Sequence, residues 1–361
     1  LHFVYHDLPR WARFWKRGSR GVHLYYYLWQ LSAIPKLRRL HRAIGFDLGH
    51  HVTFVAFRFP SALAFLGIPY IWGPVAGADR TPWPFYPVLG ISGAITEAAR
   101  EIHNRLATLD PLVRLTASNA AVILAATEAT RRAMPCSVQR KCQVIPAIGI
   151  DQEEVVIARH GQATDELRLI YVGGLVPLKG MRLALEAMAR LDASQGCVSL
   201  TVVGDGPERA KLEALASRLG ISDRVWFMGG QPRSEVLRIY REHHALIFPS
   251  LRDSGGFAVL EAMAAGLPVI CLNLGGPASA VTDETGFRIS ARTPRQVAND
   301  LANAIAFLRD NPALRQRMGE AAQYRSGQVF SWSRKAQHLR DLYARTTGSQ
   351  SANITLSGGG A

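Results

Sequence analysis

Within residues 245–276 a strand, a glycine loop, a helix and a second strand follow one another, and this run constrains the fold most. An apolar run at 245–248 ends at Pro249, and the polar loop 252–256 carries two glycines. A helix-forming run at 259–265 then stops at Gly266, and a second apolar run covers 269–272. Glycines let backbone N–H groups approach a ligand, and a helix N-terminus carries partial positive charge. The pattern therefore predicts a phosphate-binding turn.

Two carboxylates flank this turn. Asp253 lies inside the loop, and Glu261 follows it on the helix at a spacing of eight residues. Carboxylates repel phosphate, so we expect both side chains to bind hydroxyl groups of a ribose or a sugar. The ligand indicated is a sugar nucleotide.

The second half of the chain alternates strands with helices, which predicts a parallel sheet with right-handed crossovers. Ligands of such sheets bind beyond the carboxyl ends of the strands. The expected strands are 169–172, 198–203, 224–228 and 245–248, and the expected helices are 181–191, 208–219 and 234–242. Glycine loops follow the strands at Gly173-Gly174, Gly204-Asp205-Gly206, Gly229-Gly230, Gly255-Gly256 and Gly275-Gly276. Five such loops on one rim favour a binding edge.

The chain of 361 residues is long enough for two domains with full cores. We expect an N-terminal Rossmann-like domain at 1–150, a polar linker at 151–166, a C-terminal Rossmann-like domain at 167–325, a C-terminal helix at 326–346 and a disordered tail at 347–361. In the N-terminal domain, strands are expected at 51–57, 69–72, 122–125 and 144–146, helices at 61–66, 111–118 and 128–134, and a proline-rich loop at 81–87. Residues 1–5 resemble the end of a strand, so we expect this domain to be incomplete at its start.

Composition excludes several classes of protein. An apolar fraction of 48% and a charged fraction of 19% describe a globular chain. The four cysteines have no zinc-ligand spacing, and no Asp-x-Asp pair is present to hold a metal. We therefore expect no metal and no cofactor. Without 18 consecutive apolar residues or a signal peptide, we expect a cytoplasmic protein.

Positive charge is concentrated in the first half. Residues 1–150 hold 18 Lys and Arg against 7 Asp and Glu, a net of +11, whereas residues 151–361 hold 24 against 21, a net of +3. The first 42 residues contain nine basic groups with interleaved aromatic residues. Such a segment suits the anionic inner face of a plasma membrane, as a peripheral contact. The alternative is a solvated basic face whose aromatic rings enter a core. A nucleic-acid partner is disfavoured because no nucleic-acid motif is present.

These pieces together resemble glycosyltransferase family 4, the retaining group 1 sugar-nucleotide transferases. The matching segments are YVGGLVPLKG (171–180), VVGDGPER (202–209), RVWFMGG (224–230), FPSLRDSGGFAVLEAMAAGLPVI (248–270) and TDETGF (282–287). The spacing of Asp253 and Glu261 is similar to the E-x7-E motif of that family, with the first Glu shortened. The resemblance implies a GT-B fold, in which two Rossmann-like parallel-sheet domains face a cleft.

The resemblance also implies roles for residues of the second domain. Glu261 would bind the ribose hydroxyls, Asp253 the transferred sugar, and Lys179 the departing diphosphate, where negative charge develops. The backbone of Met228 and Gly229 would meet the base. The phosphates would lie against the N–H groups of Ser254, Gly255, Gly256 and Phe257, with the glycine loops at Gly173, Gly174 and Gly204 completing the donor site.

Three departures from the family pattern stand in this chain. Gly174 occupies the place of an arginine that contacts phosphate, and Arg252 is the candidate substitute. Trp72 stands at the usual position of the histidine in the N-terminal domain, so His50 and His51, in a segment similar to D-x-x-H, are the candidate catalytic histidines. The first strand and glycine loop of the family have no counterpart. We therefore expect donor binding with weak turnover.

The expected reaction is retaining transfer of a sugar from a UDP- or GDP-sugar to a glycan or a lipid-linked acceptor. One alternative is a sugar-nucleotide epimerase of related fold. Another is a truncated chain that binds nucleotide and membrane with little turnover. A NAD-dependent oxidoreductase is disfavoured, because no G-x-G-x-x-G follows a first strand.

Overall fold

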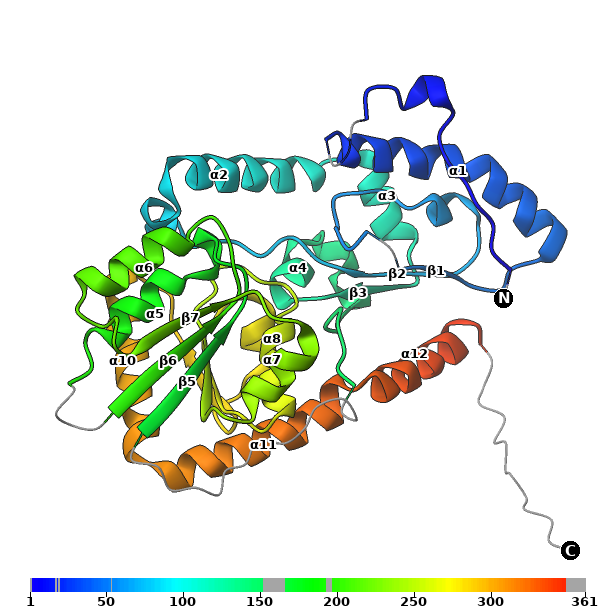
Figure 1. Cartoon of the computed structure of the whole chain (residues 1–361). Helices are drawn as coiled ribbons and strands as arrows, with labels where there is room; N and C mark the ends of the chain where they lie inside the picture. The colour runs from blue at the N-terminus through cyan, green and yellow to red at the C-terminus, as the bar shows by residue number, and fades with distance from the viewer. Residues whose placement is uncertain are drawn as a thin grey trace, which may run out of the picture.

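The computed structural model describes residues 2–16, 18, 20–52, 54–151, 166–192 and 197–348. They form two α/β units, each with its own parallel sheet, and two long helices run from the second unit back to the first (Figure 1). The expected linker and tail fall largely outside the described residues.

The six strands of the C-terminal sheet are all parallel and take the order β10-β9-β8-β5-β6-β7. Their bounds are β5 (Glu166–Val172), β6 (Cys197–Val203), β7 (Val225–Gly229), β8 (Ala245–Phe248), β9 (Val269–Leu272) and β10 (Gly286–Ile289). β6 and β7 extend the sheet on one side of β5, and β8, β9 and β10 extend it on the other. The loops after β5 and β8 therefore flank a topological switch point, where ligands of open α/β sheets bind.

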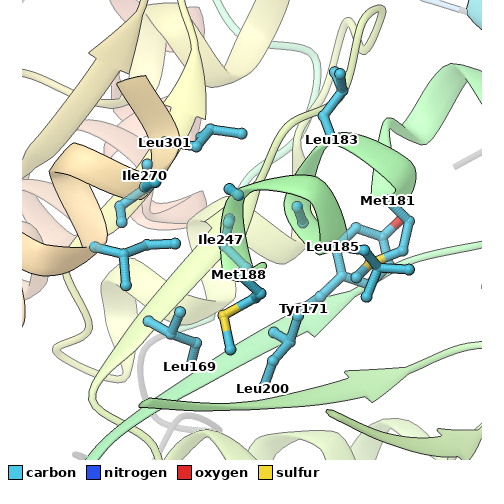
Figure 2. Close-up of a cluster of buried hydrophobic side chains, with 14 of the residues drawn as sticks. Leu169, Tyr171, Met181, Leu183, Leu185, Met188, Leu200, Ile247, Ile270 and Leu301 are labelled. Atoms are coloured by element: carbon cyan, nitrogen blue, oxygen red, sulfur yellow. The ribbon is translucent and has the colours of Figure 1, made fainter. Parts of the chain in front are cut away.

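Helices cover both faces of this sheet, and their apolar faces form its core. They are α5 (Met181–Met188), α6 (Arg209–Arg218), α7 (Arg233–Tyr240), α8 (Phe257–Ala264), α9 (Gly275–Ala280), α10 (Pro294–Asp310) and α11 (Pro312–Phe330), with the short 3-10 helix η6 (Pro177–Lys179). Figure 2 shows the packing of α5 side chains such as Met188 and Leu185 against Leu169, Leu200 and Ile247 of the strands. All of these side chains are fully buried.

The N-terminal sheet has four parallel strands in sequence order, β1 (Gly49–His51), β2 (Tyr70–Val75), β3 (Val122–Ala125) and β4 (Cys142–Val144). Its core forms around Trp72, Tyr70 and Ile123. The flanking helices are α1 (Val22–Ile44), α2 (Gly90–Ala107), α3 (Pro111–Asn119) and α4 (Glu128–Ala133), with 3-10 helices η1 (Arg10–Ala12), η2 (Ala62–Phe65), η3 (Trp83–Leu89) and η4 (Cys136–Lys141).

Most of the expected elements of the C-terminal unit lie within a few residues of the observed bounds, but several N-terminal expectations are wrong. Residues 2–9 are not a strand; they lie along α1, where Trp29 Nε1 donates to the carbonyl of His6 at 3.0 Å. The strand expected at 51–57 ends at His51, and Phe54 takes a left-handed backbone with φ of 54° that a strand excludes. The proline-rich run includes a 3-10 helix, η3, rather than only a loop.

Two segments cross between the units. Phe85 and Leu89 of η3 belong to the core of the C-terminal sheet. In the other direction, α12 (Trp332–Thr346) packs Leu342 on Ile71 and Leu124 of the N-terminal sheet. The segment that follows β4 meets the junction of α11 and α12 at Ile150, whose N–H donates to the carbonyl of Phe330 at 2.9 Å and whose carbonyl accepts from the N–H of Trp332 at 3.3 Å.

Candidate active site

The centre of the candidate site is an ion pair at the switch point. Lys179, after β5, contacts the carboxylate of Asp253, after β8, and lies 5.3 Å from the ring centroid of Phe248. Asp253 Oδ1 accepts from the N–H groups of Gly255 at 3.0 Å and Gly256 at 2.8 Å. Burial raises the pKa of Asp253, but Lys179 and these N–H groups outweigh it, so the pKa lies below its usual value. The aspartate is therefore ionised and fixed.

This geometry changes the expected role of two glycine N–H groups. We expected Gly255 and Gly256 to hold phosphate, but in the structure both donate to Asp253. Gly256 is also the N-cap of α8, and Phe257 and Ala258 open the helix beyond it. A phosphate at this helix therefore meets the N–H groups of its first turn directly, and those of the two glycines only if Asp253 releases them.

A tight contact between loops shapes the turn. Gly276 donates to the carbonyl of Asp253 at 2.8 Å. A Cβ on Gly275, which has φ of 58°, would lie 2.2 Å from the same oxygen. Some of the glycines expected to approach a ligand thus permit one strand-end loop to approach another.

Glu261 is buried on α8 and already has a partner. Its Oε1 accepts from Arg233 Nε at 2.9 Å, and the guanidinium of Arg233 also lies 5.5 Å from the ring centroid of Phe257. Arg233 opens α7 immediately after Pro232. The sequence reasoning missed this arginine, whose only local signal was its place just beyond the strand that ends at Gly229. A ribose that binds Glu261 must share or displace it.

The remaining donor-site residues expected from sequence lie at the same sheet edge. The carbonyl of Met228 accepts from the Gln231 side chain at 2.9 Å, and that of Gly229 accepts from the N–H of Gly204 at 2.8 Å. Gly173 pairs with the carbonyl of Val203, and the carbonyl of Gly174 accepts from the hydroxyl of Tyr171. The backbone of these residues is therefore engaged within the protein.

The loop at residues 252–256, here called the donor loop, also contacts the N-terminal unit. Ser254 Oγ donates to Asp79 Oδ2 at 2.6 Å, and Arg252 Nη2 lies 3.0 Å from Glu97 Oε1 of α2. Asp79 and Glu97 are both buried. Arg252, the candidate substitute for the missing phosphate-binding arginine, is thus directed to α2.

A cleft of about 790 Å³ lies between the units beside this contact. The carboxyl ends of β2, β3 and β9 open into it, and its walls include Asp79, Arg80, Glu128, Arg132, Asn273 and Ser279. Asp79 Oδ1 is buried and has no hydrogen-bond partner among the described residues. This cleft is large enough for a small polar ligand.

The structure does not bring the two candidate histidines to the Lys179–Asp253 pair. His50 contacts the hydroxyl of Tyr343 on α12 at 2.6 Å and the carbonyl of Gly73 at 2.8 Å. His51 contacts Tyr26 at 3.0 Å and Ser61 at 2.8 Å. Burial lowers the pKa of His50, so it is neutral near pH 7. Both rings are engaged in packing helices onto the N-terminal sheet.

Within the ranges that the structure describes, no cluster of three or more His, Cys, Asp or Glu side chains has the geometry to hold a metal ion. The helices in those ranges are also too short or too polar to span a membrane.

Comparison with known proteins agrees with this architecture. The model of the family "Glycosyl transferases group 1" matches residues 152–325. The 2-deoxystreptamine glucosyltransferase of Streptomyces kanamyceticus is 29% identical over 303 residues, which are 83% of this chain and 70% of that protein. The D-inositol 3-phosphate glycosyltransferase of Streptomyces avermitilis is 31% identical over 279 residues, 73% of this chain and 55% of that protein. Several other curated relatives are matched over less than half of their length.

Solved structures show the same fold. Sucrose-phosphate synthase from Thermosynechococcus elongatus has a TM-score of 0.62 at 20% identity, covering 93% of this chain and 81% of that chain. Anabaena HepE in complex with UDP and glucose has a TM-score of 0.61 at 18% identity, covering 91% and 83%. The fold is therefore GT-B, as expected, and the site lies at its switch point. The chain belongs to the group 1 glycosyltransferases.

Proposed function

We propose that this chain transfers a sugar, with retention of anomeric configuration, from a nucleotide diphosphate sugar to a hydroxyl group in the interdomain cleft. The observation that carries the proposal is the Lys179–Asp253 pair at the switch point, beside the first turn of α8. A cation and a helix N-terminus together stabilise a departing diphosphate. Structures of HepE with UDP and with UDP-glucose support a nucleotide-sugar donor of this kind.

The donor would open the ion pair as it binds. Its phosphates would attract Lys179 from Asp253, and the freed carboxylate would accept hydrogen bonds from sugar hydroxyls. Glu261 would accept the ribose hydroxyls in place of Arg233. In these exchanges each carboxylate gives up a cationic partner for hydroxyl donors, so neither carboxylate is left without hydrogen bonds.

The acceptor, a glycan or a lipid-linked sugar, would enter from the N-terminal side of the cleft. Asp79 is the candidate residue to orient it, because Oδ1 is buried without a hydrogen-bond partner among the described residues while Oδ2 is held by Ser254. An acceptor hydroxyl donating to Oδ1 would lie next to the loop that carries Asp253.

Calorimetry with UDP-sugars and GDP-sugars in EDTA tests donor binding. Affinity is expected without divalent cations, because Lys179 and α8 supply the positive charge. Binding that appears only with Mg²⁺ or Mn²⁺ would contradict the site assignment.

Proton NMR of the reaction with a mixed glycan and lipid-linked acceptor panel tests the chemistry. An axial anomeric product from an axial donor indicates retention. An epimerised free donor, formed without an acceptor, would instead indicate the epimerase alternative.

A further inference from the structure

The helix α2 exposes its apolar face and buries its polar face, the reverse of a typical amphipathic surface helix. Its four large apolar residues Ile91, Ile95, Ile102 and Leu106 are between 59% and 83% exposed, although their spacing places them along one stripe. Its buried residues are mostly polar and include Glu97 and Asn104, which belong to the contact with Arg252 and Arg58. A stripe with this periodicity normally covers a core. Here the polar face points inward, and the apolar face is left to solvent.

The apolar exposure continues beyond α2 onto the start of the chain. The rings of His23 on α1 and His103 on α2 lie 6.3 Å apart, so the N-terminal end of α1 adjoins the second half of α2. In Figure 1 the two helices lie nearly end to end along the upper edge of the molecule, with η1 above α1. Trp11 and Phe14, at η1, are each 78% exposed. The ring of Trp15 lies against Gly21, at the start of α1.

We define the α1–α2 face as the four exposed α2 residues, Leu109, Leu24, Trp11 and Phe14. Large exposed apolar side chains gathered in this number on neighbouring elements are typical of an interaction site.

The positive charge of the N-terminal residues indicates which kind of partner fits the α1–α2 face. Arg10, Arg13, Lys16 and Arg20 lie close in sequence to Trp11 and Phe14, and residues 1–150 carry a net charge of +11. Acids close in sequence to these residues already have partners: Asp7 with Arg13, Glu101 with Arg80 and Arg105, and Asp110 with the hydroxyl of Tyr27. A partner with anionic groups around an apolar interior suits such a surface. A second copy does not, because it would bring one basic segment against another.

We propose that the α1–α2 face binds the surface of an anionic lipid bilayer, with the α2 stripe and the η1 aromatics at the headgroup–acyl boundary. Aromatic rings and aliphatic side chains enter this layer while arginine and lysine contact lipid phosphates. Docking itself is independent of the proposed transfer reaction. Only one consequence rests on that function: an acceptor presented at the same bilayer would be lipid-linked.

The position of α2 connects the proposed membrane contact with the candidate active site. The polar face of α2 carries Glu97, and Glu97 contacts Arg252 of the donor loop. A bilayer that orients α2 therefore orients the loop of Arg252 and Asp253 relative to the membrane.

Co-sedimentation of the full chain with phosphatidylcholine vesicles, with and without phosphatidylglycerol, tests the proposal. Binding is expected only when phosphatidylglycerol is present, and it should decrease as salt rises. The variants Ile95→Asp and Ile102→Asp are each expected to lower the partition coefficient by about tenfold or more, since each removes one aliphatic side chain that would enter the bilayer. Tyr324→Asp is the matched control, because Tyr324 is 71% exposed on α11, away from this face.

UDP binding measured on the same variants separates this proposal from the proposed function. Unchanged UDP affinity with lost vesicle binding supports docking through this face. Vesicle binding that is the same in wild type and both α2 variants would overturn the proposal.

A wild-type measurement avoids dependence on variant folding. Brominated phosphatidylcholine mixed with phosphatidylglycerol should quench tryptophan fluorescence, because Trp11 lies in the proposed contact. Absence of quenching in vesicles that bind the chain would also overturn it. Self-association of the chain without lipid, abolished by Ile95→Asp, would instead identify a second copy as the occupant.

Discussion

Replacement of Glu261 by alanine should weaken UDP binding strongly, because the residue is buried and its carboxylate is the only acidic group on α8. Two hydrogen bonds from ribose hydroxyls to a charged acceptor contribute about 1.5–3 kcal/mol each. The free protein offsets part of this, since Glu261 already accepts from Arg233, whose side chain is 45% exposed. A half-exposed ion pair contributes about 1 kcal/mol or less. The net loss is then about 2–5 kcal/mol, or about 30-fold to about 5,000-fold in Kd.

Isothermal titration calorimetry with UDP tests whether Glu261 binds the ribose directly. The four proteins compared are wild type, Glu261→Ala, Arg233→Ala and the double variant. Arg233→Ala is expected to change Kd by less than about tenfold, because it removes only a competitor of modest strength. Glu261→Ala should cost nearly as much in the Arg233→Ala background as in wild type. If the cost of Glu261→Ala disappears in that background, Glu261 acts by holding Arg233 for the donor, and the ribose assignment is wrong.

The other predictions concern the donor loop and its contacts. Lys179→Met should raise the pKa of Asp253, because burial is then less strongly opposed. In wild type the stability that Asp253 contributes is present above its unfolded pKa near 3.8 and is lost as pH falls through the lower folded value. In the variant the folded pKa lies closer to the unfolded one, so urea unfolding across acid pH should show a smaller loss of stability. Ser254→Ala should free Asp79 and loosen the donor loop, increasing hydrogen exchange there and weakening UDP binding by about tenfold; unchanged exchange would contradict the interdomain contact. Gly275→Ala should lower the free energy of unfolding by more than about 2 kcal/mol, since the left-handed backbone costs about 1–2 kcal/mol and the new Cβ would meet the Asp253 carbonyl.

Gly45→Ala is the control for the glycine prediction. Gly45 has φ of 73°, and a Cβ there would have nothing within 4 Å. Its replacement should cost only the backbone term of about 1–2 kcal/mol. Equal losses of unfolding free energy at both positions would mean that the contact between the strand-end loops is not tight.

Local sequence patterns predicted the helices and strands whose boundaries depend only on neighbouring residues. The strand at 269–272 was predicted at its observed bounds, and the helix at 259–265 within two residues, because a proline, a glycine loop and a helix-forming run specify each boundary. The same holds for Ser61, which caps η2 as its place before an apolar run predicts.

Contacts between distant segments could not be read from the sequence. Asp79 and Ser254 are 175 residues apart, and Arg233 meets Glu261 only because α7 packs beside α8. The periodicity of α2 is misleading for a physical reason: apolar spacing identifies a stripe but not whether protein or another surface covers it. The role of Asp253 as a partner of Gly255 and Gly256 also depends on loop conformation, which composition does not specify.

The paired connections at Ile150 limit how the two units can move. A single flexible link would let one unit twist freely on the other. Here the segment after β4 is hydrogen-bonded through Ile150 to Phe330 and Trp332 of the returning segment, so the two are held side by side. Because Phe85 and Leu89 of η3 are also buried in the C-terminal core, a rotation of one unit on the other would have to break contacts at both places. Ser254, bonded to Asp79 across the cleft, would therefore keep one register against the N-terminal unit.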